Sequence, residues 1–172
     1  HQIALQMAAM TYLIASGISA AASVRAGNQL GIKNISGLRQ AAFSAFAMVI
    51  ISQGIFALGF ISFRFLIPVL FNNEPEVRNI VSSLLLIAAL FQISDGIQVV
   101  ALGVLRGIKD VVIPTWITLV SYWLIGLPCS YVFAFVLGLG VQGIWYGLTI
   151  ALTLAAVFLF LRFNYVSKRL NF

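Results

Sequence analysis

The sequence of 172 residues contains little charge and almost no cysteine or histidine. Only 8% of the residues are charged, whereas about a quarter are charged in a soluble globular domain. The single cysteine, Cys129, excludes an internal disulfide and a cysteine-rich metal site. The one histidine is His1, so Cys129 has no histidine in the interior of the chain to activate it. Since paired aspartates and zinc motifs are also missing, no enzymatic activity is predicted.

Long apolar stretches are what the sequence does contain. Hydrophobic residues make up 62% of the chain, and a bilayer core needs about 20 mostly apolar residues per helix. None of the stretches alternates polar and apolar residues as the strand of a membrane barrel does. The predicted fold class is therefore an all-α polytopic membrane protein. Its five transmembrane helices are expected at residues 2–24, 40–63, 80–105, 114–137 and 141–161.

The beginning of the sequence gives a further expectation. No signal peptide is recognisable, because no basic region precedes the first apolar segment. The chain starts with His-Gln-Ile rather than with Met. We therefore expect it to be a fragment of a longer protein.

The basic residues predict an orientation in the membrane. Eight of them fall in the first loop, the third loop and the tail, and two fall in the second connection. By the positive-inside rule, the eight mark the cytoplasmic side. The C-terminus is then cytoplasmic, and His1 lies outside. The net charge of +6 is read as this signal and not as a nucleic-acid-binding surface.

Glycine, proline and asparagine suggest where helices end and approach one another. Four such residues, Asn28, Gly31, Asn34 and Gly37, are expected to break the chain between the first two spans. Pro128 falls inside the fourth span, where it removes one backbone hydrogen bond and is expected to kink the helix. Three glycines, Gly140, Gly143 and Gly147, lie on one side of the fifth helix and permit close packing of a neighbour.

Asp95 is the only acidic residue inside the apolar stretches. A carboxylate in lipid costs roughly 3 kcal/mol on insertion scales, so such a residue is a candidate functional site. Arg106 lies eleven residues further along, or about 16 Å on a helix axis. This distance places Asp95 near the bilayer midplane and too far from Arg106 to be neutralised. Gln92 and Gln98, three residues before and after, extend a polar stripe on the same helix.

Three interpretations of Asp95 remain open from the residues alone. Its carboxylate could be hydrogen-bonded permanently to a neighbouring helix. It could bind a hard cation such as sodium, together with amide oxygens. It could instead take up a proton, because burial favours the uncharged acid. The last two interpretations imply ion-coupled transport, with Asp95 as a metal ligand if sodium is the ion.

Other polar residues are scattered through the spans. Most are predicted to form hydrogen bonds between helices, each contributing under about 2 kcal/mol. These residues are Gln53, Ser121, Tyr122, Ser130, Tyr131, Thr149 and Thr153.

Several stretches resemble one transporter family. Residues 91–110, FQISDGIQVVALGVLRGIKD, are similar to the tenth helix and following turn of NorM-type multidrug and toxic compound extrusion (MATE) transporters. Residues 1–5 (HQIAL), 22–31 (ASVRAGNQLG) and 140–147 (GVQGIWYG) look like other recurring stretches of that family. The resemblance extends over essentially the whole chain, from the eighth helix to the twelfth.

The resemblance implies an antiporter in the plasma membrane, with two six-helix lobes around a central cleft. Entry of Na⁺ or H⁺ would drive export of amphipathic or cationic drugs and toxic compounds. No cofactor is implied, apart from Na⁺ as a possible coupling ion. The position of the family's coupling acid is Asp95, and Gln2 and Gln6 match positions facing the cleft. Some members have a tyrosine where this chain has Phe91, so that hydroxyl is absent here.

The resemblance also implies missing parts. The first lobe is absent, and so is the helix that supplies a second carboxylate to the ion site. The N-terminal lobe is therefore an expected partner of this chain, together with lipid and small-molecule substrates. Five of the six helices of the second lobe are expected within residues 1–172.

Two alternative functions remain. A lipid-linked sugar flippase of the same superfamily commonly has a more cationic cleft, whereas only Asp95 is charged at depth here. A membrane scaffold without transport activity is the other alternative. Efflux in susceptible cells that express the intact gene would distinguish the scaffold from a transporter.

Overall fold

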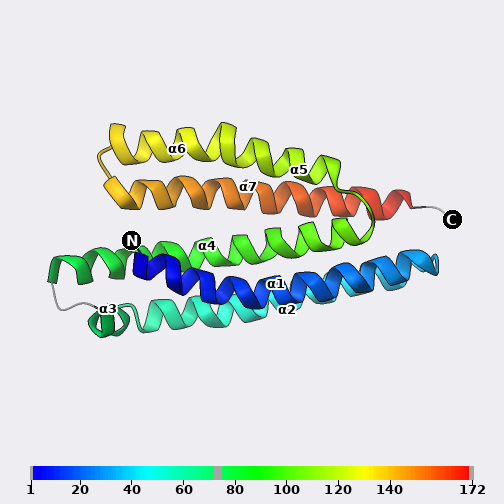
Figure 1. The fold of residues 1–172 in the computed structure, drawn as a ribbon, viewed down its shortest axis with the longest axis horizontal. Coiled ribbons are helices and arrows are strands. Elements are labelled where there is room, and N and C mark those ends of the chain that lie inside the picture. The colour runs from blue at the N-terminus through cyan, green and yellow to red at the C-terminus, as the bar shows by residue number, and fades with distance from the viewer. Residues whose placement is uncertain (1, 72–74, 171–172) are drawn as a thin grey trace.

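The computed structural model describes residues 2–71 and 75–170. Every secondary-structure element in this part of the chain is helical, which confirms the predicted fold class (Figure 1). The elements are α1 (Gln2–Gly31), α2 (Ile35–Ser62), α3 (Leu66–Phe71), α4 (Pro75–Gly107), α5 (Val112–Leu119), η1 (Val120–Gly126), α6 (Leu127–Tyr131), η2 (Val132–Val136) and α7 (Gly140–Arg169).

Five helical stretches of the described chain are long and apolar enough to cross a membrane. The fourth is continuous through α5, η1, α6 and η2, where η1 and η2 are π-helical. The five spans are Leu5–Gly31, Ile35–Ser62, Val77–Gly107, Val112–Val136 and Gly140–Arg169. Their number and order agree with the sequence prediction.

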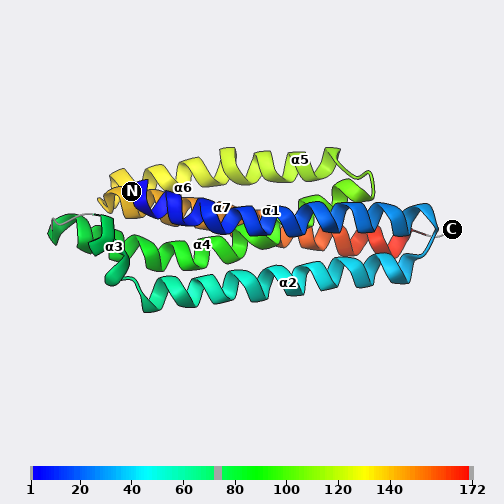
Figure 2. The ribbon, with the colours of Figure 1, turned by 60° about the horizontal axis from the view of Figure 1, so that its bottom comes forward.

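Helix α4 lies at the centre of the bundle. It packs against α1 and α2 on one side and against α7 on the other. The fourth span packs on α7, outside the central helix (Figures 1 and 2). Two apolar clusters fill the contacts around α4, one including Leu38, Val100 and Phe163, the other including Leu84 and Trp145. Because α4 packs against three of the other spans, its polar residues can lie at contacts with several helices.

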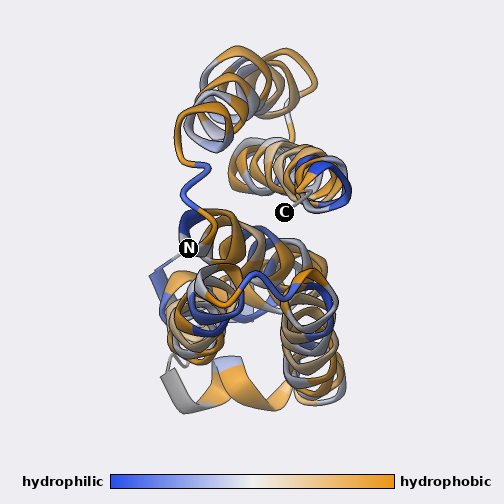
Figure 3. Cartoon of the chain, turned by 90° about the vertical axis from the view of Figure 1, so that its right-hand side faces the viewer, coloured by the Kyte–Doolittle hydropathy of each residue, from blue (hydrophilic) through white to orange (hydrophobic). Residues whose placement is uncertain are grey.

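The surface of the bundle is as apolar as a lipid-facing surface should be. Large hydrophobic side chains are exposed along every span, among them Leu13, Leu58, Trp123 and Phe135. Figure 3 looks along the bundle and shows hydrophobic residues on the helices in both its upper and its lower part. An exposed apolar surface of this extent indicates contact with a membrane or a partner.

The helix ends differ from the prediction. The sequence predicted an irregular loop between residues 24 and 40, but α1 continues to Gly31 and α2 begins at Ile35. Asn34 does not simply break the chain; its Oδ1 accepts a hydrogen bond of 3.0 Å from the Gly37 backbone N–H and caps α2. Similarly, α7 runs eight residues beyond the predicted end at residue 161, to Arg169. Helices continue past the apolar stretch because a polar side chain leaves the lipid without ending the backbone hydrogen bonds.

The fifth span approaches the fourth through two glycines, as predicted. A Cβ atom added to Gly143 would lie 2.5 Å from the backbone nitrogen of Ala134, and one added to Gly147 would overlap Ser130. Gly140 has open space around it, so it does not contribute to this contact. It lies instead in the tight turn with Gly138, and both have positive φ values (+56° and +68°) that favour glycine.

The helix around Pro128 departs from the regular α-helical hydrogen-bond pattern. The π-helical segments η1 and η2 lie directly before and after the short α6 that contains it. Proline supplies no N–H and its ring crowds the preceding turn, and π-helical turns are a known accommodation of irregularity in a helix. The helix continues through Pro128 with a changed register.

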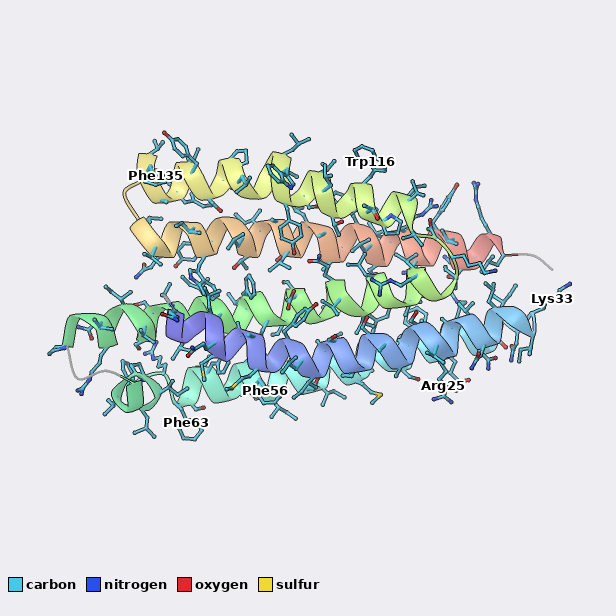
Figure 4. The ribbon with its side chains drawn as sticks, in the orientation of Figure 1. Arg25, Lys33, Phe56, Phe63, Trp116 and Phe135 are labelled. Carbon is cyan, nitrogen blue, oxygen red and sulfur yellow. The ribbon has the colours of Figure 1, made fainter. Side chains whose placement is uncertain are left out.

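Charged residues gather at the ends of the bundle. Arg25 and Lys33 lie toward the end at which the C-terminus emerges (Figure 4), and the turn from α4 to α5 lies there too (Figure 1). At this end Asp110 forms an ion pair of 2.8 Å with Arg162. The three strongly basic segments of the sequence thus share one end. His1, which also entered the orientation argument, lies outside the described residues.

Candidate functional site

The predicted polar stripe of α4 spreads toward two neighbouring helices. Gln92, Asp95 and Gln98 follow one another at intervals of three residues, so each is rotated by about 60° from the last. Gln92 and Gln98 are buried, with 2% and 5% of their surfaces exposed, whereas Asp95 is half-buried. The carboxylate therefore lies between two buried amides and faces the more open side of the helix.

Gln92 connects α4 with α2 and, through it, with α1. Its Nε2 donates a hydrogen bond of 3.2 Å to the backbone oxygen of Gln53, and the Nε2 of Gln53 donates one of 3.0 Å to the backbone oxygen of Thr11. The Oε1 atoms of both glutamines are buried and accept no hydrogen bond within the described structure. A buried acceptor without a partner costs about 1–3 kcal/mol. These two unpaired oxygens therefore lower the stability of the folded bundle.

Gln98 connects α4 with the fourth span. The hydroxyl of Tyr122, on η1, donates a hydrogen bond of 2.9 Å to Gln98 Oε1. This contact uses one of the two lone pairs of the amide oxygen that the sequence suggested as a cation ligand.

The side of α4 that faces α7 is closed by direct contacts. Phe91 and Trp145 meet edge to face, with ring centroids 5.3 Å apart. Ser94 and Thr153 are joined by a hydrogen bond of 2.9 Å between their hydroxyls. Phe91 thus serves the packing between helices, and Ser94 is tied to α7.

Asp95 itself forms no hydrogen bond or ion pair with any of the residues that the structure describes. Asp110, by contrast, is paired with Arg162. The described chain also contains no group of three or more His, Cys, Asp or Glu side chains that could hold a metal. A cation at Asp95 therefore needs neutral oxygen ligands or water around it. Hard cations such as sodium accept such ligands.

A polar hollow lies beyond Asp95 on the same face of α4. Val99, Leu102 and Arg106 follow at four, seven and eleven residues, which is the spacing of one helix face. They line a cavity of about 180 Å³ between α4 and α1. Its α1 side carries hydroxyl groups from Tyr12, Ser16, Ser19 and Ser23. The hollow thus lies in the part of the span that leads to the basic end of the bundle.

Gln2 and Gln6 lie on the first turns of α1, and both are exposed. Neither makes a hydrogen bond within the described part of the chain. The structure does not bring them into the hydrogen-bonded set around α4, so their role as substrate contacts remains a prediction.

The sequence did not assign two members of this hydrogen-bonded set to the site. Gln53 and Tyr122 were expected only to join helices in general, and both do so. A signal was available for a third feature, the pair Gly103 and Gly107 in an apolar helix. These glycines bring α4 against the backbone of α1 at Ser19 and Ser23.

Comparison with known proteins supports the resemblance seen in the sequence. The MatE family profile matches residues 1–132. The Multidrug resistance protein MdtK of Yersinia enterocolitica is 38% identical over 98% of this chain, and MdtK of Yersinia pestis is equally similar. The chain spans 38% of the length of these curated relatives.

Solved structures share the fold. A crystal structure of the eukaryotic MATE transporter AtDTX14 is 26% identical, with a TM-score of 0.88 over 99% of this chain and 40% of its own. An inward-facing and an outward-facing multidrug resistance MATE family transporter of the MOP superfamily are 19% and 18% identical. The inward-facing structure has a TM-score of 0.87, and the match covers 97% of this chain and 39% of that transporter. The outward-facing structure has a TM-score of 0.89, and the match covers 98% of this chain and 38% of that transporter. The same arrangement of five helices therefore occurs in both conformations.

Proposed function

Because the chain belongs to the MatE family, we propose that it is part of the second lobe of a cation-coupled drug antiporter in the plasma membrane. In this proposal the chain supplies five of the lobe's six helices, and a first lobe faces it across a cleft. The chain spans only 38% of the length of its Yersinia relatives, which leaves room for that lobe. The relatives are multidrug resistance proteins, which supports amphipathic and cationic compounds as the exported substrates.

The observation that carries the proposal is the unneutralised Asp95. No described residue pairs with its carboxylate, although α4 is the central helix of the bundle. Holding an unpaired charge at this depth is costly. A bound cation or proton offsets this cost, and its release leaves a site that attracts a cationic drug. We therefore assign the coupling role to Asp95, with either Na⁺ or H⁺ as the ion.

Coupling follows if the ion and the drug favour opposite-facing states of the transporter. A ligand shifts a conformational equilibrium only through its different affinities for the two states. Similar five-helix arrangements occur in an inward-facing and an outward-facing relative. This similarity supports a mechanism in which the lobe moves largely as a unit around the Asp95 site.

The test replaces Asp95 with Asn in the complete transporter, reconstituted in proteoliposomes. Asn keeps the size of the side chain and removes its charge. We expect drug export to lose its dependence on the Na⁺ or H⁺ gradient. Asp110→Asn is the matched control, because it removes a carboxylate outside the apolar stretches and should preserve that dependence. Export by Asp95→Asn with an unchanged ion dependence would remove Asp95 from the mechanism.

A further inference from the structure

Tyr122 reaches the coupling helix from a span that packs mainly elsewhere. The segment η1 lies against α7, and α7 separates the fourth span from α4 in Figure 1. The Tyr122 hydroxyl nevertheless donates to Gln98 Oε1 over 2.9 Å. Gln98 is almost fully buried, so this bond forms in a site with little access to water.

The π-helical form of η1 determines where Tyr122 lies. The backbone N–H of Leu127 donates a hydrogen bond to the backbone oxygen of Tyr122, which lies five residues earlier in the chain. In an α-helix the acceptor lies four residues earlier. Such a turn holds one more residue, so side chains before and after it are rotated relative to a regular helix. The glycine that ends η1, Gly126, lies against Ala151 on α7, where an added Cβ would be 2.8 Å from the Ala151 Cβ. Segments of this kind occur frequently at functional sites.

The hydroxyl fixes the orientation of the Gln98 amide. Oε1 has two lone pairs and the Tyr122 hydroxyl uses one of them, so the amide is held in place while its oxygen can still ligate a cation. Gln98 lies three residues from Asp95 on α4, at a spacing that makes their side chains neighbours. The tyrosine is thus connected to Asp95 through Gln98.

We propose that Tyr122 is a positioning residue of the Asp95 site, acting through the hydrogen bond from its hydroxyl to Gln98. This inference rests on the proposed function. Tyr122 keeps the Gln98 amide in one orientation, so that the surroundings of Asp95 are set before the ion arrives. The π-helical turn supplies the geometry, and movement of the fourth span on α7 would release the amide. The fourth span therefore regulates how tightly the coupling ion is held.

The test measures the affinity of the purified complete transporter for radiolabelled Na⁺ at fixed pH, and the pH dependence of drug binding without Na⁺. Tyr122→Phe removes only the hydroxyl, and we expect it to weaken ion affinity roughly tenfold, the effect of one buried hydrogen bond. The matched control is Tyr131→Phe, in the same span, where the tyrosine is exposed and makes no hydrogen bond to the described residues. It should remain within about twofold of the wild type.

A double-mutant cycle separates positioning from a general structural effect. Gln98→Leu should weaken ion affinity as Tyr122→Phe does, and the double variant should be no weaker than the worse single variant. If Gln98→Leu does not fold, Gln98→Met keeps the length of the side chain without its oxygen. Additive losses, or equal ion affinity in Tyr122→Phe and Tyr131→Phe, would overturn the inference and leave the proposed function intact. A wild type without ion dependence would overturn both.

Discussion

At the scale of single residues, three buried glutamine side chains on or against the helix that carries Asp95 differ in how they are held. Gln92 and Gln53 use their nitrogen atoms to bind backbone oxygens of neighbouring helices and leave their own oxygens unpaired. Gln98 uses its oxygen, which receives the Tyr122 hydroxyl. The sequence identified Asp95, Gln92 and Gln98 because they share one helix. It could not pair Gln92 with Gln53, because these residues lie on different spans and only packing brings them together.

The amide nitrogen of Gln53 provides a prediction at this scale. Gln53→Glu keeps the shape of the side chain but places a carboxylate oxygen against the backbone oxygen of Thr11. We expect a loss of more than about 2 kcal/mol in the free energy of unfolding, because a buried polar group without a partner is costly. Gln53→Met, which removes both polar atoms, should stay within about 1 kcal/mol of the wild type.

Thermal unfolding of the complete transporter in detergent measures this difference. The two variants have side chains of similar length, so packing alone predicts similar melting temperatures. Equal stability of Gln53→Glu and Gln53→Met would show that a carboxyl group without a partner at this position does not destabilise the bundle.

At the scale of helices, hydropathy located every span but not the helix ends. The apolar stretch of α1 ends near residue 24, yet the helix continues to Gly31. Hydropathy reports where side chains leave lipid, whereas a helix ends where its backbone hydrogen bonds end. The π-helical register around Pro128 also escaped prediction, because proline indicates a disturbance without specifying which register replaces the regular one. The direction of Tyr122 depends on that register.

The contact between the fourth and fifth spans yields a prediction for a pair of glycines. Gly143→Ala places a Cβ 2.5 Å from the backbone nitrogen of Ala134, so the two spans must separate. We expect destabilisation of about 1–3 kcal/mol, as for an overpacked core. Gly54→Ala, in the interior of α2 with open space around it, should be neutral or stabilising by up to about 1 kcal/mol.

The comparison of these two variants uses the same chemical change in two helices. Unfolding in denaturant, followed by tryptophan fluorescence, gives both free energies. If Gly143→Ala proves as stable as Gly54→Ala, the close approach of the fourth and fifth spans is not present in the folded protein.

At the scale of the whole molecule, the basic segments at one end predict the orientation in the membrane. Replacement of Cys129 by Ser, together with any cysteine in the rest of the complete transporter, leaves a background for single labels. Ile32→Cys, in the turn between α1 and α2, should react with an impermeant maleimide only after cells are permeabilised. Leu139→Cys, in the turn before α7, should react from outside. Both positions are exposed in the structure. The reverse pattern would place the basic end outside and contradict the positive-inside prediction.

The account as a whole depends on competition between ion and drug through Asp95. If the ion changes the affinity for the drug, the drug changes the affinity for the ion by the same factor. An ion that drives drug release must therefore weaken drug binding at equilibrium. The most direct measurement is the drug affinity of the purified complete transporter at increasing Na⁺ concentration and at decreasing pH. We predict that one of these changes weakens drug binding in the wild type and has no effect in Asp95→Asn. The same weakening in Asp95→Asn would contradict the account.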